Sequence, residues 1–349
     1  MPIIEAVGTA VPAYCLHQTE AKKMAEKLFQ GMRPSLERYL SVFDHAAIER
    51  RYFCTLPEWF EESHSFSEKN DLYVRSACDL GVQAAMSCLK ACNLSPEEVD
   101  HLIVVSSTGL ATPSLDARLM NRLPFRADIR RTPIWGLGCA GGAVGLTLAC
   151  EWAKAFPRGR ALLLAVELCG LTFQRNDVSK SNLIAASLFA DGAAAALISG
   201  DAAGGEGPQW LASMSTTWND TLDVMGWNVT DDGLDVIFSR DIPAFVRRYL
   251  PDAVKRFLQR QQLKGLECLD HLIAHPGGVK VIQAYADMFQ VPMVKFSSSL
   301  HVLKNYGNMS SPTVLFVLKE AMKEAGSGEY GLLFALGPGF SAEQVLLQW

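Results

Sequence analysis

Short apolar runs alternate with longer amphipathic stretches along the whole chain. Apolar runs of about 4–8 residues are typical of buried strands, and apolar positions that recur every three or four residues are typical of helices. The pattern predicts strands at 101–106, 133–135, 161–166, 193–198, 271–274, 331–336 and 343–349, and helices at 71–93, 143–155 and 243–262. Such alternation of strands and helices predicts an α/β fold.

The most linker-like segment, SGDAAGGEG at 199–207, suggests two parts, an N-terminal half at 1–205 and a C-terminal half at 206–349. Each half has a strand that ends in SSTG or AHPGG, then a helix, then GCAGG or GNMSS opening a further helix. This repetition predicts a duplicated α/β unit. If the halves face each other, Cys139 and Asn308 lie at matching helix starts, and His275 lies at a nearby strand end.

Composition narrows the class of protein. The 349 residues are 49% hydrophobic, which is enough for a large core and argues against disorder. The net charge of −5 disfavours a general nucleic-acid binder. We expect a cytoplasmic protein, because no apolar run reaches about 18 residues and the N-terminus lacks a basic signal region. The nine cysteines form no CxxC motif, which disfavours disulfides and a zinc ribbon and predicts reduced thiols.

One cysteine, Cys139, stands in the segment IWGLGCAGG. The glycines permit a tight strand-to-helix turn, and a helix N-terminus favours a thiolate. A small residue packed in a turn would look similar. A third interpretation also remains, because residues 136–141 match GxGxxG and Glu167 ends the next predicted strand, as in dinucleotide sites. However, Glu167 lies 26 residues after Gly141, where the usual spacing is about 20.

His275 and Asn308 are the candidate partners of this cysteine. His275 follows an apolar strand at a Pro-Gly turn, and ligands bind at strand ends in α/β sheets. Asn308 precedes an apolar helix, where it could cap the helix or donate to an anionic intermediate. A structural histidine is the alternative for His275, and metal ligation together with His271 is disfavoured because a strand does not align the two. Together the three residues predict acyl transfer.

Other chemistry-bearing residues are interpreted as structural. Cys88, Cys92, Cys150 and Cys169 lie in apolar stretches and are expected in the core. The short charged run Glu49-Arg50-Arg51 is expected to form a solvated face.

Five motifs, in order, resemble the type III polyketide synthases, the chalcone synthase superfamily. They are GCAGG at Cys139, SLFADGAAAA at Phe189, HPGG at His275, GNMSS at Asn308 and GPGF at 337–340. The segments STGLATPSLDARLMNRLPF, IWGLGCAGG, SNLIAASLF and VIFSRDIP are most similar to bacterial alkylpyrone synthases. The resemblance covers nearly the whole chain.

The resemblance implies a thiolase-like αβαβα layered fold of two related halves, usually as a homodimer, with CoA thioesters as substrates and no metal or other cofactor. It implies that Cys139 carries the acyl group. His275 and Asn308 would promote decarboxylation of malonyl-CoA and stabilise the resulting enolate. We also expect a His275 imidazolium to pair with the Cys139 thiolate and to lower the pKa of that cysteine.

The resemblance also implies a set of substrate-binding positions. Phe189 would be the gatekeeper between the CoA tunnel and the cavity, and Val236 replaces a second phenylalanine of the plant enzymes, which suits a wider or longer cavity. Thr112 would reach the cavity of the partner subunit. Further substrate-binding positions are Ser107, Thr108, Thr172, Gly277, Ser310 and Trp227, the last where plant enzymes have glycine. The residues that contact the CoA phosphates would be Arg38 and His45. Ser41 stands where the family has a cation, and Lys280 would substitute for that missing charge.

The sequence therefore predicts a cytoplasmic acyltransferase. It would load a fatty acyl-CoA starter on Cys139, extend it with malonyl-CoA by decarboxylative Claisen condensation, and cyclise the product to an alkylpyrone after two or three cycles. Three alternatives remain: an initiation-type β-ketoacyl-carrier-protein synthase that performs one condensation, a type III synthase that makes alkylresorcinols or uses aromatic starters, and an inactive thiolase-fold partner subunit.

Overall fold

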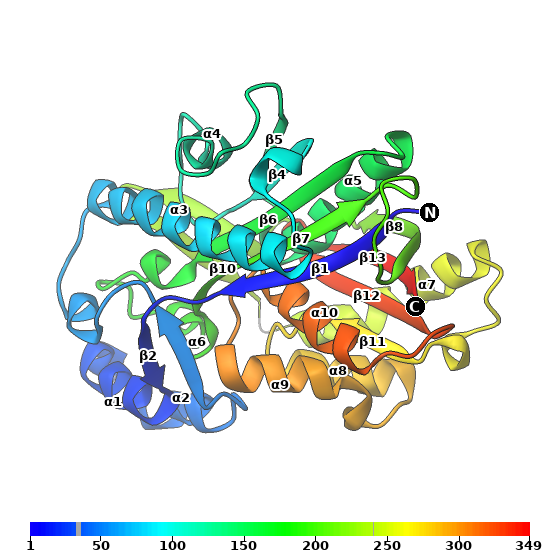
Figure 1. The fold of residues 1–349 in the computed structure, drawn as a ribbon. Helices are drawn as coiled ribbons and strands as arrows, with labels where there is room; N and C mark the ends of the chain where they lie inside the picture. Colours follow the sequence, from blue (N-terminus) through cyan, green and yellow to red (C-terminus); the bar gives the residue numbers. More distant parts are fainter. Residues whose placement is uncertain (33–35, 240) are drawn as a thin grey trace.

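A long mixed sheet runs through the centre of the molecule (Figure 1), and residues 1–32, 36–239 and 241–349 are described by the computed structural model. Arg240, which belongs to the motif VIFSRDIP, lies outside the described residues. In the described parts the sheet has nine strands in the order β11-β12-β13-β8-β1-β7-β6-β4-β5. Their bounds are β1 (Ile3–Ala10), β4 (His101–Val105), β5 (Arg130–Ile134), β6 (Arg160–Leu168), β7 (Asp191–Ser199), β8 (Gln209–Thr217), β11 (His271–Ala274), β12 (Tyr330–Gly337) and β13 (Ser341–Gln348).

The two halves of the sheet repeat one pattern of pairing. In the first half, β4 and β6 are parallel, and β6-β7 and β7-β1 are antiparallel. In the second half, β11 and β12 are parallel, and β12-β13 and β13-β8 are antiparallel. The halves meet where Ile3 of β1 pairs with Gln209 of β8. This agrees with the predicted duplication, and the boundary between residues 205 and 206 stays a prediction.

Helices form layers on both sides of these half-sheets. α3 (Phe66–Ala91) packs on β1, β6 and β7, whereas α5 (Gly141–Ala155) and α10 (Thr313–Glu324) contact each other and strands of both halves. α7 (Ile242–Arg260) and α8 (Val279–Phe289) cover the outer side of the second half. The fold is therefore α/β and thiolase-like, as predicted. In the described parts of the chain, no helix is long and apolar enough to span a membrane.

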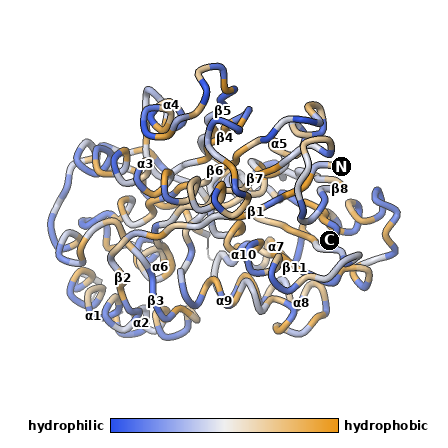
Figure 2. The backbone as a smooth tube through the Cα atoms, viewed as in Figure 1, coloured by the Kyte–Doolittle hydropathy of each residue, from blue (hydrophilic) through white to orange (hydrophobic). Residues whose placement is uncertain are grey.

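The apolar runs are explained by burial on both strand faces. Along β6, Leu162, Leu164 and Val166 pack against α3, and the alternate residues Leu163 and Ala165 belong to the core around α5 and α10. Side chains alternate between the faces of a strand, so a strand that is buried on both faces is continuously apolar. Figure 2 shows that the hydrophilic residues gather on the outer loops.

The smaller elements were not predicted, and several of them surround one side of the site. They are β2 (Tyr14–His17), β3 (Arg50–Phe53), α1 (Gln18–Leu28), α2 (Leu36–Asp44), α6 (Lys180–Leu188), α9 (Ser297–Tyr306) and the separate hairpin β9 (Met225–Thr230) and β10 (Gly233–Phe238). The short helix α4 (Leu115–Leu119) lies between SSTG and GCAGG, where a helix was predicted. α3 also begins earlier than the predicted residue 71. Ser65 accepts a hydrogen bond from the Glu68 N–H and donates its own N–H to the Glu68 carboxylate, which is a capping box.

Candidate active site

The structure brings the segments that carry Cys139, His275 and Asn308 together. Cys139 lies in a 3₁₀ turn before α5, His275 follows β11, and Asn308 lies between α9 and α10. The Cys139 thiol donates to the Ser310 hydroxyl across 3.6 Å, and the Asn308 side-chain amide donates to the Gly277 carbonyl across 3.3 Å. The duplicated topology explains this meeting, because two helix starts and a strand end from opposite halves converge.

The electrostatics of this group differ from the prediction. Burial raises the pKa of the Cys139 thiol to about 11, although hydrogen bonding with Ser310 and Asn308 lowers it in part. Burial also lowers the pKa of His275 to about 3, and neither of its ring nitrogens has a hydrogen-bond partner among the described residues. The expectation that a His275 imidazolium lowers the Cys139 pKa is therefore wrong for this structure. Loss of water disfavours both charged forms, so the thiol and the imidazole are both neutral.

The turn at Asn308 is tied to the end of α6. Asn308 donates its N–H to the Leu188 carbonyl at 2.9 Å, and its carbonyl accepts from the Ala190 N–H at 3.0 Å. Phe189 lies between these two contacts and pairs with Asn308. Gly307 has a φ of +70°, and a Cβ there would lie 2.8 Å from the Arg51 side chain. The backbone before Asn308 therefore requires glycine.

Glu167 is a buried carboxyl beneath the site. It accepts hydrogen bonds from the Ser107 N–H at 2.9 Å, the Thr108 hydroxyl at 2.8 Å and the Ser311 hydroxyl at 2.7 Å. Burial raises the pKa of Glu167 to about 7. The dinucleotide interpretation is therefore wrong, because this carboxyl is occupied inside the protein and is not free to bind a ribose.

Ser107 links this carboxyl to the turn of Cys139. Its hydroxyl accepts the N–H groups of Gly136 and Gly138, each at 3.2 Å. Ser107 and Thr108 are both buried. Ser107 holds the loop that carries Cys139, and Thr108 holds Glu167 and the end of β6. These positioning roles were not predicted from the sequence.

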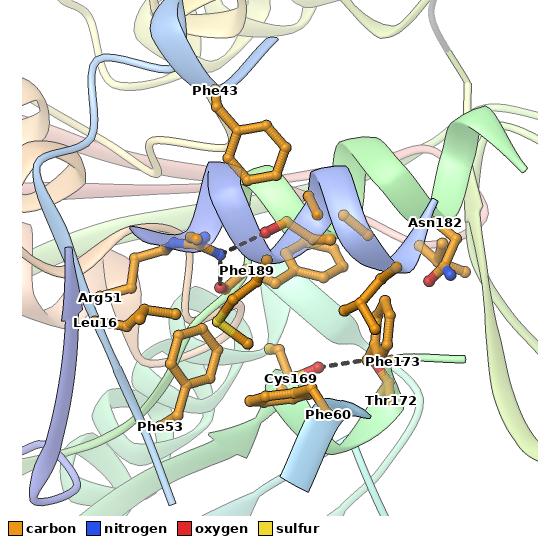
Figure 3. Close-up of a pocket in the computed structure, with 18 of the residues that line it drawn as sticks. Leu16, Phe43, Arg51, Phe53, Phe60, Cys169, Thr172, Phe173, Asn182 and Phe189 are labelled. Carbon is orange, nitrogen blue, oxygen red and sulfur yellow. Dashed lines mark hydrogen bonds between the residues drawn. The ribbon is translucent and has the colours of Figure 1, made fainter. Parts of the chain in front are cut away.

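An apolar cavity lies beside the group and contains about 610 Å³ of empty space, counting its mouth. Figure 3 shows the rings of Phe43, Phe53, Phe60 and Phe173 around it. It is lined by Leu16, Ala21, Met24, Ala25, Leu28, Phe29, Phe43, Arg51, Phe53, Phe60, Cys169, Gly170, Thr172, Phe173, Asn182, Ala185, Ala186, Phe189 and Val236. Three predicted substrate-binding residues, Thr172, Phe189 and Val236, are in this lining. Cys139, His275 and Asn308 are not, and Phe189 connects the cavity to Asn308.

The hairpin of β9 and β10 forms one wall near Phe189. Trp227 pairs directly with Val236 across the hairpin. The ring of Phe189 lies 6.1 Å from that of Trp227 and 6.4 Å from that of Phe238, centroid to centroid. The predicted gatekeeper therefore packs edge-on against two aromatic rings of the hairpin.

Arg51 was expected on a solvated face, and that prediction is wrong. It is only 2% exposed, and its guanidinium donates to the carbonyls of Ala186 and Phe189 and to the side chain of Gln18. Its neighbour Arg50 is exposed. Burial lowers the pKa of Arg51 to about 9, although the charge of Asp191 opposes this. Figure 3 shows that the guanidinium meets two carbonyl oxygens.

The other predicted contacts lie away from this cavity. Arg38 and His45 are exposed on and just after α2, and Ser41 between them accepts at its carbonyl from the His45 ring at 2.6 Å. Lys280 is exposed on α8. Whether these residues bind CoA phosphates stays a prediction.

Thr112 lines a surface groove with the exposed side chains of Leu110 and Trp135.

The ring of His271 pairs with the Glu329 carboxylate at 2.7 Å. No group of three side chains that could bind a metal is found in the described ranges. Of the cysteines expected in the core, Cys88, Cys150 and Cys169 are buried and Cys92 is partly exposed.

Comparisons with known proteins agree with this geometry. The family models of chalcone and stilbene synthases match residues 2–202 with their N-terminal domain and residues 210–349 with their C-terminal domain. A Bacillus subtilis (strain 168) protein named for chalcone synthase is 43% identical over all of this chain and 99% of its own. The 1,3,6,8-tetrahydroxynaphthalene synthase of Streptomyces peucetius subsp. caesius is 36% identical, over 99% of this chain and 93% of its own. The crystal structure of 1,3,6,8-tetrahydroxynaphthalene synthase from Streptomyces coelicolor A3(2), a bacterial type III polyketide synthase, superimposes with a TM-score of 0.93 at 28% identity, over 99% of both chains.

Proposed function

The chain belongs to the family of chalcone and stilbene synthases, the type III polyketide synthases, which are acyltransferases, and from this premise we propose its starter, its residues and its product. It loads a fatty acyl-CoA on Cys139, extends the chain with malonyl-CoA, and releases an alkylpyrone. No metal or redox cofactor takes part. The observation that carries the choice of starter is the apolar cavity that Phe189 helps to line.

Loading of the acyl group begins with Cys139 and His275 both uncharged. The Cys139 thiol passes its proton to a free ring nitrogen of His275, and the sulfur attacks the thioester carbonyl of the acyl-CoA. The bond to the CoA sulfur breaks, and His275 returns the proton to the leaving CoA thiolate. The unpartnered ring of His275 supports this role, since His275 has no hydrogen bond of its own to give up before it accepts the proton.

In the extension step, Asn308 and His275 stabilise the negative charge of an enolate. Malonyl-CoA loses CO2, and the electron pair of the broken C–C bond forms an enolate whose oxygen accepts from the Asn308 amide and from a ring N–H of His275. The enolate carbon attacks the acyl group on Cys139, and the Cys139 thiolate leaves. The long 3.3 Å contact of the Asn308 amide with Gly277 supports this assignment, because a charged oxygen is a better acceptor than a carbonyl.

The cavity supports a fatty starter over a short or polar one. Aliphatic and aromatic side chains form most of its lining. Each methylene that leaves water for such surroundings contributes about 0.8 kcal/mol. The curated relatives are named for tetrahydroxynaphthalene and 3,5-dihydroxyphenylacetyl-CoA, so the starter and the ring are argued from this cavity and from the resemblance to alkylpyrone synthases.

The decisive experiment incubates the enzyme with a panel of short, long and aromatic acyl-CoAs, each with malonyl-CoA, and measures product masses. Long aliphatic starters should give triketide or tetraketide pyrones. Preference for aromatic starters, or resorcinol products, would contradict the proposed substrate and ring while leaving the chemistry. A single condensation that requires a carrier protein would contradict the polyketide mechanism for this chain.

A homodimer is the proposed assembly. Leu110 and Trp135 are 43% and 50% exposed and lie beside Thr112, the residue predicted to reach the partner subunit. Exposed apolar groups at one groove favour protein contact. Light scattering after size-exclusion chromatography would test this, and a monomer at micromolar concentration would contradict it.

A further inference from the structure

Lys69 is a buried cation that joins three separate segments. It lies in the first turns of α3 and is only 7% exposed. Its ammonium donates to the Phe173 carbonyl at 3.1 Å, to the Gln174 side-chain carbonyl at 3.0 Å and to the Asp232 carbonyl at 3.2 Å. A lysine ammonium has three donors, so each one has an acceptor.

These acceptors belong to two walls of the apolar cavity. Phe173 follows Thr172, and both line the cavity. Asp232 lies in the turn between β9 and β10, and β10 carries Val236, which lines the same cavity. One ammonium therefore connects the wall at 172–173 to the wall formed by the hairpin.

The hairpin turn is seated closely on this group. A Cβ at Gly233 would lie 3.0 Å from the Gln174 side-chain nitrogen and 3.9 Å from the Lys69 nitrogen, and Gly233 has a φ of +133°. In the described chain, β9 and β10 form a two-stranded sheet of their own. Val229 near its tip is 64% exposed. Because no larger sheet holds the hairpin, its position depends on contacts with neighbouring segments, which are α6, the 3₁₀ turn at Cys169–Thr172 and this group at its own turn.

Lys69 also lies directly behind predicted substrate-binding residues. A small hollow is lined by Lys69, Thr108, Thr172 and Gly233, among others. Burial lowers the pKa of Lys69, and the charges of Asp232 and Asp235 oppose this only in part. A buried cation held by neutral oxygens is costly to desolvate, so its position is better explained by what it holds in place than by stability alone.

We propose that Lys69 is a positioning residue that sets the width of the acyl cavity by holding the β9–β10 hairpin against the segment after Thr172, and so selects long starters. This rests on the proposed function. Without the ammonium, three carbonyl oxygens lose their shared donor and the hairpin is free to shift relative to Phe173. A long chain needs the whole wall, whereas a short starter needs only the region near Phe189.

The test compares Lys69→Met with Lys90→Met, which removes an exposed lysine from the same helix. kcat and KM are measured with hexanoyl-CoA and palmitoyl-CoA, each with malonyl-CoA. Lys69→Met should raise the KM for palmitoyl-CoA by about tenfold or more, because hydrogen bonds to charged groups contribute about 1.5–3 kcal/mol. The KM for hexanoyl-CoA should change by less than about threefold. Lys90→Met should match the wild type, and Lys69→Arg should restore part of the long-chain preference.

Gln174→Leu is a milder variant in case Lys69→Met folds poorly, since it removes one acceptor and keeps the cation. Gln174→Leu should also raise the KM for palmitoyl-CoA relative to the KM for hexanoyl-CoA. Equal losses for both starters, in proportion to the folded fraction measured by circular dichroism, would show that Lys69 only stabilises the fold and would overturn the inference. The inference is also overturned if the wild type is active and both variants have the same KM values as the wild type for palmitoyl-CoA and hexanoyl-CoA. A wild type that extends no fatty acyl-CoA overturns the proposed function and this inference with it.

Discussion

Arg51 donates a hydrogen bond from Nη1 to the main-chain carbonyl of Phe189 at 2.7 Å, directly behind the predicted gatekeeper. The same nitrogen donates to the Ala186 carbonyl at 2.8 Å, so it satisfies carbonyls at the C-terminal end of α6. The position of Phe189 therefore depends on a guanidinium that comes from β3, far away in the sequence.

The first prediction concerns this contact. Arg51→Met should lower the free energy of unfolding by at least about 2 kcal/mol, because it leaves buried carbonyls without donors. Arg50→Met is the matched control, since Arg50 is exposed and its contact with Asn305 lies at the surface; it should cost less than about 1 kcal/mol. Urea denaturation measures both, and equal effects would contradict the role of Arg51.

The second prediction concerns acyl loading. Cys139→Ala should abolish the covalent adduct that intact-protein mass spectrometry detects after incubation with one acyl-CoA. Cys15→Ala is the control, because Cys15 is the exposed thiol and should have no part in loading. An adduct of normal yield on Cys139→Ala would place the acyl group on another residue and refute the proposed nucleophile.

The third prediction is a pH dependence of stability that comes from Glu167. Its folded pKa of about 7 lies above the ordinary value of 4.5, so the folded state binds this proton more tightly than the unfolded state does. The stabilisation is complete below pH 4.5 and is lost as the pH rises to about 7, for a total of about 3 kcal/mol. Glu167→Gln cannot titrate and should lack this loss.

The measurement is the free energy of unfolding of both proteins in urea at several values between pH 4.5 and 8. Asp191 also has a raised pKa, of about 6, but it is present in both proteins and cancels in the comparison. Parallel curves for the wild type and Glu167→Gln would mean that Glu167 is ionised in the folded protein throughout this range.

The sequence predicted those parts of the molecule that depend on local pattern. Strand β11 lies at His271–Ala274, the predicted range, because an apolar run buried on both faces is visible in any short window. Likewise, glycine-flanked Cys139, His275 and Asn308 could be recognised at element ends without knowing their neighbours.

What the sequence did not predict depends on distant partners. Arg51 looks like its exposed neighbour Arg50 until the carbonyl of Phe189, 138 residues away, is placed beside it. The hairpin of β9 and β10 is half-exposed and has a weak apolar pattern, and Lys69 meets its turn from 163 residues earlier. The pKa of Cys139 was predicted in the wrong direction, because helix position suggests a thiolate whereas burial, which no local pattern reveals, favours the thiol.

The last prediction concerns cavity length. Val236 lines the apolar cavity and faces Trp227 across the hairpin, beside the Phe189 ring. Val236→Phe should fill part of this space and lower kcat/KM for palmitoyl-CoA by about tenfold or more, since each methylene that stays in water forfeits about 0.8 kcal/mol and two are enough. Hexanoyl-CoA should be affected by less than about threefold. The matched control is Val229→Phe, which adds the same bulk to the same hairpin at a position that is 64% exposed. If both variants, or neither, lose palmitoyl-CoA activity, the acyl chain does not occupy this cavity, and the starter must bind elsewhere.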